Sequence, residues 1–168
     1  GAGMSLKKVR CCDNARNGLE LRSGGFANLE DCHLYRNGNN GIMTCQNAGP
    51  LKTKNCEIHS HSRAYKCGIL ISESSATLNA CKLYGNGLAG VLTEKKGILR
   101  AIDCKILNNC NGVLILNTGS ARVEKCNVKS NRGNGIYVGF DRQGLVEILD
   151  NDIQDNMSKG ILIEKGNS

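Results

Sequence analysis

The segment Gly112-Val113-Leu114-Ile115 is one of seven copies of a short pattern: glycine, an apolar residue, any residue, then an apolar residue or threonine. The other six copies begin at Gly18, Gly41, Gly68, Gly90, Gly135 and Gly160. Successive glycines of this series lie 23, 27, 22, 22, 23 and 25 residues apart. Copies at a nearly constant spacing indicate a repeat protein in which each copy belongs to one structural unit.

A second apolar pattern precedes each glycine pattern and has the period of two that is typical of a half-buried strand. In the fifth unit it consists of Leu99, Ala101, Cys104 and Ile106. The step from the second to the third apolar position is three residues instead of two, which predicts a bend between two short strands. Each unit of 22–27 residues therefore predicts two or three short strands and no helix.

Asparagines recur before the glycines of the series. Six of them stand four residues before a glycine: Asn14, Asn37, Asn86, Asn108, Asn131 and Asn156. Asparagine tolerates the left-handed backbone conformation, and its amide can bond backbone groups at a turn. In stacked units these residues predict an asparagine ladder along the stack, with His61 in the same place in the third unit. We expect them to hold turns and to take no part in chemistry.

Together these patterns predict an all-β chain, a right-handed parallel β-helix solenoid of about seven coils of 22–27 residues each. One coil cannot bury its apolar face alone, so neighbouring coils must stack. The unit apolar-x-Leu-x-x-Cys/Asn-x-Ile-x-x-Asn, followed by Gly-Ile-x-Ile, resembles the parallel β-helix repeat of the pectin-lyase-like superfamily. In particular it resembles the β-helical region of F-box proteins and of Shc-binding, spindle-associated scaffold proteins. The resemblance covers Met4 to Glu164 and implies the fold, but the same repeat serves sugar enzymes and non-enzymatic scaffolds.

The length of 168 residues suits one domain, with residues 1–3 as an expression scar and residues 4–168 as a single β-helix. We find no apolar run long enough to span a membrane and no secretory signal before the first unit. Because the first and last coils have no capping helix, we expect a fragment of a larger protein or a solenoid that associates end to end with itself. The net charge of +7 is modest, and we expect no binding of nucleic acid.

Ten cysteines raise the question of disulfide bonds. Five of them occupy one inward position of successive units: Cys32, Cys56, Cys81, Cys104 and Cys126. A buried free cysteine behaves as a small apolar residue, and a row with one cysteine per coil has no natural pairing. We therefore expect reduced thiols and an intracellular protein, cytoplasmic or nuclear. The spacing of cysteine and histidine matches no zinc signature, so we expect no metal and no other cofactor.

A β-helix enzyme that acts on acidic sugars needs carboxylates clustered on adjacent coils, with an arginine or lysine as base or clamp. Alternation predicts one outward column of Arg10, His33, Glu57, Lys82, Lys105, Asn127 and Asp152, and another of Lys7, Glu30, Lys54, Asn79, Ile102, Glu124 and Leu149. Neither column places two carboxylates on neighbouring coils. The segment 137–142 is faintly similar to a Tyr, Gly, Asp-Pro-His motif of β-helix sugar epimerases, but it lacks the proline and the histidine. We therefore expect no enzymatic activity.

The third residue of each glycine pattern should point outward, because the second and fourth point into the core. Six of these seven residues are apolar: Met43, Leu70, Leu92, Leu114, Tyr137 and Leu162. Consecutive coils would set them about 4.8 Å apart. The result is an apolar stripe of a kind that soluble proteins seldom leave bare. A second column, rich in rings, contains Tyr35, His59, Tyr84 and Leu107, and it would suit either stacking on a sugar or anchoring a peptide.

Two classes of function follow from these columns. The apolar stripe, with Tyr35 and Tyr84, favours a non-enzymatic intracellular module that binds a protein or peptide partner. Two structural alternatives also fit the stripe: the protein itself covers it, or the alternation is shifted and the stripe faces the core. The alternative function is a carbohydrate-binding or carbohydrate-active β-helix of the lyase, hydrolase or epimerase type, which predicts a carboxylate cluster.

Overall fold

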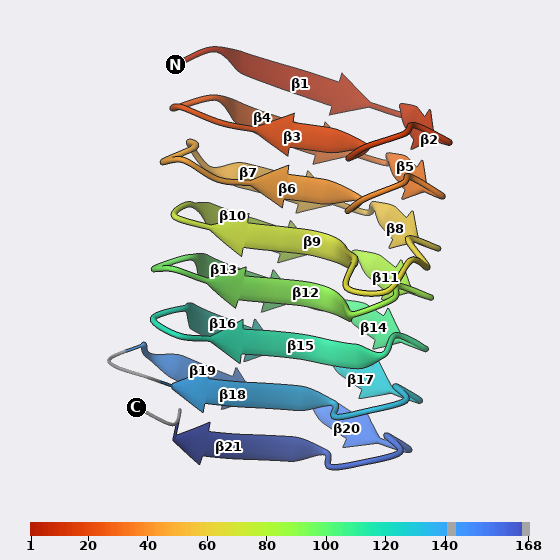
Figure 1. Ribbon diagram of the computed structural model, residues 1–168, viewed down its shortest axis with the longest axis vertical. Helices are drawn as coiled ribbons and strands as arrows, with labels where there is room; N and C mark the ends of the chain where they lie inside the picture. Colours follow the sequence, from red (N-terminus) through yellow and green to blue (C-terminus); the bar gives the residue numbers. More distant parts are fainter. Residues whose placement is uncertain (141–143, 166–168) are drawn as a thin grey trace.

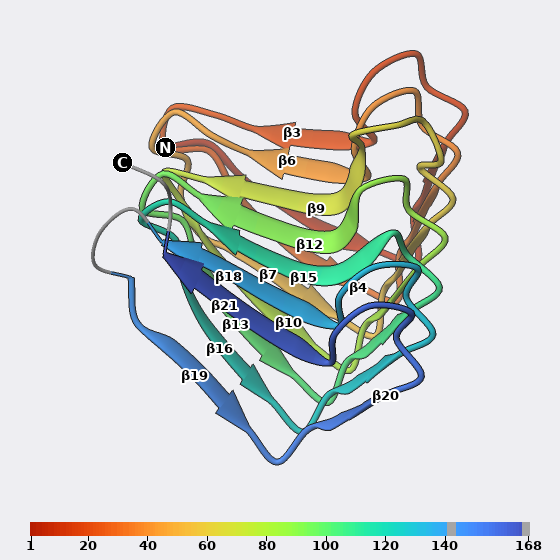
Figure 2. The ribbon, with the colours of Figure 1, turned by 60° about the horizontal axis from the view of Figure 1, so that its bottom comes forward.

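The computed structural model describes residues 1–140 and 144–165 and forms a stack of seven coils (Figure 1). Each coil contributes one strand to each of three seven-stranded parallel sheets, which we name A, B and C. Figure 2 shows these sheets as three sides of the coil. The predicted all-β parallel solenoid of about seven coils is confirmed. Within the described ranges no helix is long and apolar enough to cross a membrane.

The strands follow one another along the chain in the order A, B, C. Sheet A contains β1 (Gly3–Lys7), β4 (Phe26–Glu30), β7 (Leu51–Lys54), β10 (Ser75–Asn79), β13 (Ile98–Ile102), β16 (Ser120–Glu124) and β19 (Val146–Leu149). Sheet B contains β2 (Arg10–Cys12), β5 (His33–Tyr35), β8 (Glu57–His59), β11 (Lys82–Tyr84), β14 (Lys105–Leu107), β17 (Asn127–Lys129) and β20 (Asp152–Gln154). Sheet C contains β3 (Leu19–Leu21), β6 (Ile42–Thr44), β9 (Cys67–Ser72), β12 (Ala89–Glu94), β15 (Asn111–Leu116), β18 (Ile136–Phe140) and β21 (Ile161–Lys165).

Equivalent residues of successive coils pair in register, so each position of the repeat forms a column. Leu78 of β10, for example, pairs with Thr53 on one side and Ala101 on the other. The inward side chains of all three sheets form one continuous core, in which residues such as Ile58 and Ile106 are fully buried. Because the side chains of a strand alternate between its two sides, the other residues of each strand form the outer faces of the solenoid.

One residue in the left-handed conformation makes the bend between sheet A and sheet B. This residue has a φ of 51–55° in every coil: Lys8, Asp31, Asn55, Ala80, Asp103, Lys125 and Asp150. In five coils a cysteine follows it, and the thiol donates a hydrogen bond to the carbonyl two residues earlier, as Cys104 does to Ile102 at 3.2 Å. The predicted bend is confirmed, and all ten cysteines are free thiols in the structure.

The asparagine ladder lies at the turn between sheets B and C, with one correction in the fifth coil. There the ladder residue is Asn109, whose Oδ1 accepts the backbone N–H of Asn86 at 3.1 Å. The predicted residue, Asn108, instead has a φ of 54° and makes the turn just before the ladder. Counting backward from the glycine failed because the turn between ladder and glycine is one residue shorter in this coil. The distance from the cysteine position to the ladder is five residues in every coil.

His61 takes the ladder position of the third coil, as predicted. Its Nδ1 accepts the backbone N–H of Asn37 at 3.2 Å, and its Nε2 donates to the carbonyl of Leu34 at 3.2 Å. The ring therefore replaces both the oxygen and the nitrogen of an asparagine amide. It is fully buried, and this burial lowers the pKa of the imidazole below its usual value.

Candidate functional site

The outer face of sheet C carries the apolar stripe. Strand register places six residues in one column: Met43, Leu70, Leu92, Leu114, Tyr137 and Leu162. None of them belongs to the main core, so the expected outward direction is confirmed and the alternative of a shifted alternation is wrong.

The middle of this stripe is covered by the chain itself. Leu92 and Leu114 are each only 7% exposed, and they form a second hydrophobic cluster with buried Cys67 and Ala89. Four more side chains pack against this cluster: Leu70, Leu88, Leu116 and Tyr137. The stripe is therefore a second, outer hydrophobic cluster, as expected if the protein itself covers it.

Stacked rings occupy the outer face of sheet B. The ring of His59 lies between those of Tyr35 and Tyr84, with centroids 5.2 and 4.4 Å away and planes within 6° of parallel. Lys82 Nζ lies 4.6 Å from the centre of the Tyr84 ring, and the Arg36 guanidinium lies 5.0 Å from that of Tyr35. Because these contacts use the ring faces, the column offers mainly ring edges, and our expectation that it could stack on a sugar has little geometric support.

The outer face of sheet A differs from both, because it is polar and hollowed. Its central column, which points outward from the middle of each strand, is Ser5, Asn28, Lys52, Thr77, Arg100, Arg122 and Glu147. Two shallow hollows lie along it. One, of about 320 Å³, lies over β4, β7 and β10 and is lined by residues that include Lys52 and Lys54. The other, of about 330 Å³, lies over β13, β16 and β19 and includes Arg100.

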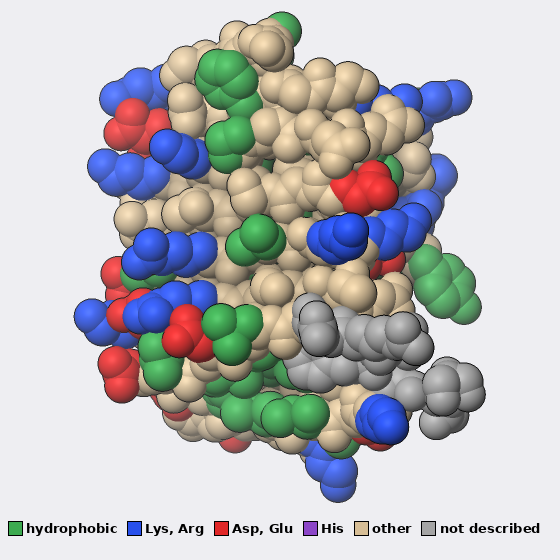
Figure 3. All heavy atoms as spheres, turned by 90° about the vertical axis from the view of Figure 1, so that its left-hand side faces the viewer, with side chains coloured by type: hydrophobic (Ala, Val, Ile, Leu, Met, Phe, Trp, Pro, Cys, Tyr) green, Lys and Arg blue, Asp and Glu red, His purple; other side chains and the backbone are tan. Residues whose placement is uncertain are grey.

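The third to fifth coils of this face carry three cations, and the acidic residues nearest to them, Glu30 and Glu147, are paired with other cations. Lys52, Lys54 and Arg100 are exposed, and none of them forms an ion pair with another residue that the structure describes. The outward residues between them in the fourth coil, Thr77 and Asn79, are neutral. Figure 3 shows Lys and Arg side chains along its left edge, the side on which sheet A lies, with Asp and Glu side chains beside them toward the top and the bottom.

Acidic residues lie toward the two ends of the same face, where each is neutralised. Glu30 forms an ion pair with Lys7, with 3.0 Å between Glu30 Oε2 and Lys7 Nζ. Near the other end Arg122 forms two ion pairs, one with Glu124 at 3.0 Å and one with Glu147 at 3.1 Å. The hydrogen bond to Glu124 raises the pKa of Arg122 above its usual value. The two carboxylates stand on neighbouring coils, an arrangement that we missed because they belong to different columns.

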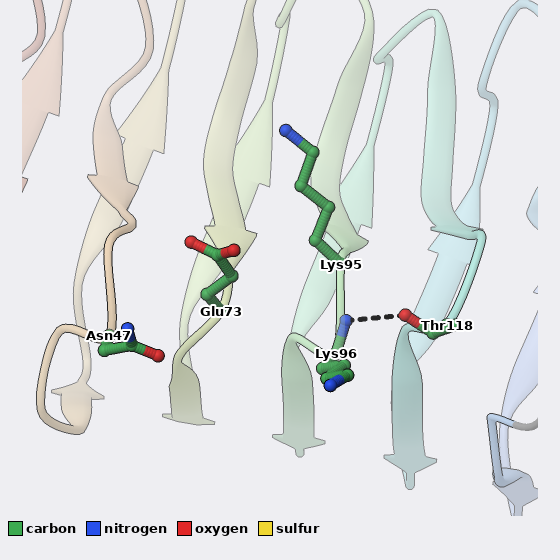
Figure 4. Close-up of a pocket in the computed structure, with 5 residues that line it drawn as sticks. All are labelled: Asn47, Glu73, Lys95, Lys96 and Thr118. Carbon is green, nitrogen blue, oxygen red and sulfur yellow. Dashed lines mark hydrogen bonds between the residues drawn. The ribbon is translucent and has the colours of Figure 1, made fainter.

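A further hollow borders sheet A at the turns that enter its strands. It measures about 370 Å³ and is lined by Asn47, Glu73, Lys95, Lys96 and Thr118 (Figure 4). The backbone N–H of Lys96 donates to Thr118 Oγ1 at 2.9 Å, and the two lysine side chains extend in different directions. This edge therefore adds two exposed cations next to the face of sheet A.

The described part of the chain contains no group of three His, Cys, Asp or Glu side chains that could hold a metal ion. The segment compared with the epimerase motif is only partly described. Tyr137 Oη donates to Glu164 at 3.0 Å, whereas Asp141 and Arg142 lie outside the described residues.

The sheet A face could have been found from the sequence. Its central column lies two residues before a column that we had already assigned as outward, so strict alternation assigns it as well. Lys52 and Arg100 belong to no local sequence motif. Only alignment of the coils shows that they share one column of the face.

Comparison with known proteins supports the fold. The profile of the family described as right-handed β-helix region matches residues 1–78 and 17–168. The periplasmic alginate epimerase has a TM-score of 0.72 at 11% identity, over 96% of this chain and 46% of its own. The A-module of a mannuronan C-5 epimerase from Azotobacter vinelandii has a TM-score of 0.68 at 11% identity, over 95% of this chain and 57% of its own. A pectate lyase has a TM-score of 0.61 at 10% identity, over 86% of this chain and 51% of its own.

This chain thus spans about half the length of the solved structures that it matches. No curated protein matches it in sequence. The structural matches overturn our expectation of a non-enzymatic protein-interaction module, because the solved structures that share the coil are epimerases and a lyase. At such low identity they establish the fold alone, and the inference of function must come from this chain's own surface.

Proposed function

This chain belongs to the right-handed β-helix family, and we propose that it is a carbohydrate-active protein that binds an acidic polysaccharide along the outer face of sheet A. The observation that carries the proposal is the set of exposed cations, Lys52, Lys54 and Arg100, without acidic partners in the described residues. Such cations attract a chain that bears a carboxylate on each sugar. The enzymes that share the fold support this substrate class, since alginate, mannuronan and pectate are all polymers of uronic acids.

The spacing of the cations suits a polymer better than a single sugar. Lys52 and Arg100 belong to coils that are two apart, which places their backbones about 10 Å from each other. A polymer that follows the stack would meet one cation after another with the same backbone geometry. Each contact between a cation and a carboxylate is a charge-assisted hydrogen bond, which is stronger than a neutral one.

Neutral polar groups fill the space between the cations. Asn28, Thr77 and Asn79 line the same hollow as Lys52 and Lys54. Amide and hydroxyl side chains both donate and accept hydrogen bonds, so they suit the hydroxyl groups of a sugar. The face therefore offers partners for both kinds of group on a uronic acid.

The cations also suit chemistry at the carbon next to the carboxylate. A proton on that carbon is easier to remove when a nearby cation neutralises the carboxylate, because negative charge develops there in the transition state. Epimerisation and elimination both begin with transfer of that proton to a base. Lys52 and Lys54 are the residues that we assign to this neutralising role.

The proposal is tested first by binding. Polymannuronate and polygalacturonate, with neutral dextran as reference, are titrated into the protein and followed by calorimetry. We expect the two polyuronates to bind and dextran not to bind. Lys52→Glu should weaken polyuronate binding by about tenfold or more, because it replaces an attraction by a repulsion. Lys105→Glu is the matched control, since Lys105 is also exposed and also forms no ion pair among the described residues, but lies on sheet B.

Activity is measured on the same polymers. Elimination creates a carbon–carbon double bond that absorbs in the ultraviolet, and epimerisation changes the NMR signal of the carbon-bound proton. Binding without either product would leave a carbohydrate-binding protein without catalytic activity. Equal affinity for dextran and polyuronate, or equal losses from Lys52→Glu and Lys105→Glu, would contradict the site.

A further inference from the structure

The two hollows of the sheet A face differ in the side chains that line them. In the first hollow, over β4, β7 and β10, the only apolar residue among the described lining residues is Leu29, which is buried. The second hollow, over β13, β16 and β19, is bordered by Ile98 and Leu145, which are 54% and 72% exposed. Figure 3 shows hydrophobic side chains beside charged ones in the lower left part of its view. One face thus presents a polar hollow and an apolar hollow.

Strand register explains how the second hollow arises. Ile98 of β13 pairs with Ser120 of β16. In the next coil the carbonyl of Leu145 accepts the backbone N–H of Ala121 at 3.0 Å, and the Leu145 N–H donates to Ser120 Oγ at 3.3 Å. Leu145 therefore lies one coil beyond Ser120, on the opposite side from Ile98. The small side chain of Ser120 leaves a gap between the two larger apolar side chains.

An unpaired cation lies beside this gap. Arg100 and Ile98 are two residues apart on β13, so both point outward and lie about 6.6 Å from each other along the strand. The other cation of the hollow, Arg122, already forms ion pairs with Glu124 and Glu147. Arg100 forms no ion pair with the residues that the structure describes. The second hollow therefore combines one available positive charge with an apolar surface.

This combination favours a ligand that carries an anion and an apolar substituent together. An unmodified uronic acid offers its carboxylate to Arg100, but its hydroxyl groups would lose hydrogen bonds to water against Ile98 and Leu145. Methyl esterification of the carboxylate would supply an apolar group and remove the charge that Arg100 attracts. An acyl ester on a ring hydroxyl keeps the carboxylate and replaces the hydroxyl by a group that ends in a methyl.

We propose that the second hollow holds an O-acyl group, such as O-acetyl, of a partly acylated polyuronate whose carboxylate is bound by Arg100. This inference rests on the proposed function and names the form of the polymer that the face prefers. In a uronic acid, carbon 2 lies across the ring from carbon 5, which bears the carboxylate. One sugar can therefore reach Arg100 with its carboxylate and the gap between Ile98 and Leu145 with its acyl group. The polar first hollow then takes sugars whose hydroxyls are free.

The experiment compares one polymannuronate sample before and after partial chemical O-acetylation, by calorimetric titration into the protein. We expect the acetylated polymer to bind the wild-type chain about fourfold more tightly, which is the effect of burying about one methyl group. Acetylated dextran carries acetyl groups without carboxylates and should not bind, because it offers no anion to Arg100. Binding of acetylated dextran as tight as that of acetylated polymannuronate would overturn the proposal.

Two substitutions test the apolar gap directly. Ile98→Ser and Leu145→Ser should each abolish the preference for the acetylated polymer, so that both forms of polymannuronate bind with equal affinity. Both side chains are already more than half exposed, so circular dichroism should show that the variants fold. Tyr65→Ser is the matched control and should keep the preference, since Tyr65 is 80% exposed but lies on a loop of the third coil outside sheet A.

The outcomes separate this inference from the proposed function. If neither form of polymannuronate binds, the proposed function is wrong, and this inference is wrong with it. If both forms bind the wild-type chain with equal affinity, the polyuronate face is retained and the acyl site alone is wrong. The same conclusion follows if Ile98→Ser and Leu145→Ser keep the preference for the acetylated polymer.

Discussion

The outer faces of sheets A and C are built on the same backbone and have opposite properties. On sheet C the outward column is apolar, and its middle residues Leu92 and Leu114 are covered by the chain's own side chains. On sheet A the outward column is polar, and its middle cations Lys52 and Arg100 are exposed. The apolar side chains of the sheet C face already pack against other residues of the chain. The cations of the sheet A face, in contrast, form no ion pair with the described residues. An apolar stripe in a sequence is therefore weaker evidence for a binding site than a row of uncompensated charges.

The largest effect that separates the two faces is expected in stability. Leu114→Ala should lower the free energy of unfolding by about 3 kcal/mol, because it removes a buried side chain and leaves a cavity in the outer cluster. Urea unfolding followed by circular dichroism measures this change. Leu162→Ala is the control in the same column, and its loss should be smaller because Leu162 lies only half-buried in the last coil. Equal losses would mean that the middle of the stripe is no better packed than its end.

The converse substitution on sheet A should affect binding and leave stability unchanged. Arg100→Ala should weaken polyuronate binding by about 1.5 kcal/mol, roughly tenfold, because it removes one charge-assisted hydrogen bond. The free energy of unfolding should change by less than about 0.5 kcal/mol, since the side chain is exposed. Calorimetric titration and urea unfolding of the same preparation give both values. A large loss of stability with unchanged binding would reverse the roles that we assign to the two faces.

The bend that separates sheet A from sheet B allows a stabilising substitution. Ala80 has a φ of 51°, a conformation that favours glycine. Ala80→Gly should raise the free energy of unfolding by about 0.5 to 1 kcal/mol, because relief of the left-handed strain exceeds the added freedom of the unfolded chain. Ala76→Gly, at a buried strand position only four residues away, should lower it by about 1 kcal/mol. Thermal unfolding of both variants shows whether the change in stability comes from the left-handed bend or from glycine at any position.

The smallest expected effect is on the pH dependence of stability, through His61 of the asparagine ladder. Burial lowers the pKa of His61, so the unfolded chain takes up a proton near the ordinary histidine value of about 6.5 while the folded chain still resists it. The stability that the neutral ring contributes is therefore complete above that pH and decreases as the pH falls through the folded pKa. His61→Asn should remove this part of the pH dependence and retain the ladder. Urea midpoints between pH 5 and 7, a range of about two units around that value, provide the measurement; parallel profiles of wild type and variant would show that His61 is not the group involved.

The features of the fold that alternation and period determine could be predicted from the sequence. The seven coils, the bend before each cysteine position and the outward direction of Leu92 all follow from spacing within one unit. The ladder residue of the fifth coil could not be found by counting from the glycine, because turn length varies between coils. The distance from Cys104 to Asn109 does not vary and would have found it.

The surface was harder to predict, for two physical reasons. The covering of Leu92 depends on Leu88 and Leu116, which lie outside the repeated pattern and approach the stripe only in three dimensions. The positive face depends on which acidic residues are already paired: Arg122 pairs with Glu124 of the neighbouring column and with Glu147 of its own column. The class of function could not come from the repeat at all, since one solenoid supports many chemistries.

The in-register stacking of coils has a consequence for how such a chain can change in length. Residues 90–111 make up one full repeat of 22 residues, and removing them would place Val113 beside Ile69 and Leu114 beside Leu70 with no shift of register. Each coil contacts only its neighbours, so the loss is confined to one junction. Gain or loss of whole coils therefore lengthens or shortens the outer faces and leaves the cross-section unchanged. In this architecture, the number of sugars that a face could span is a quantity that duplication and deletion can adjust one step at a time.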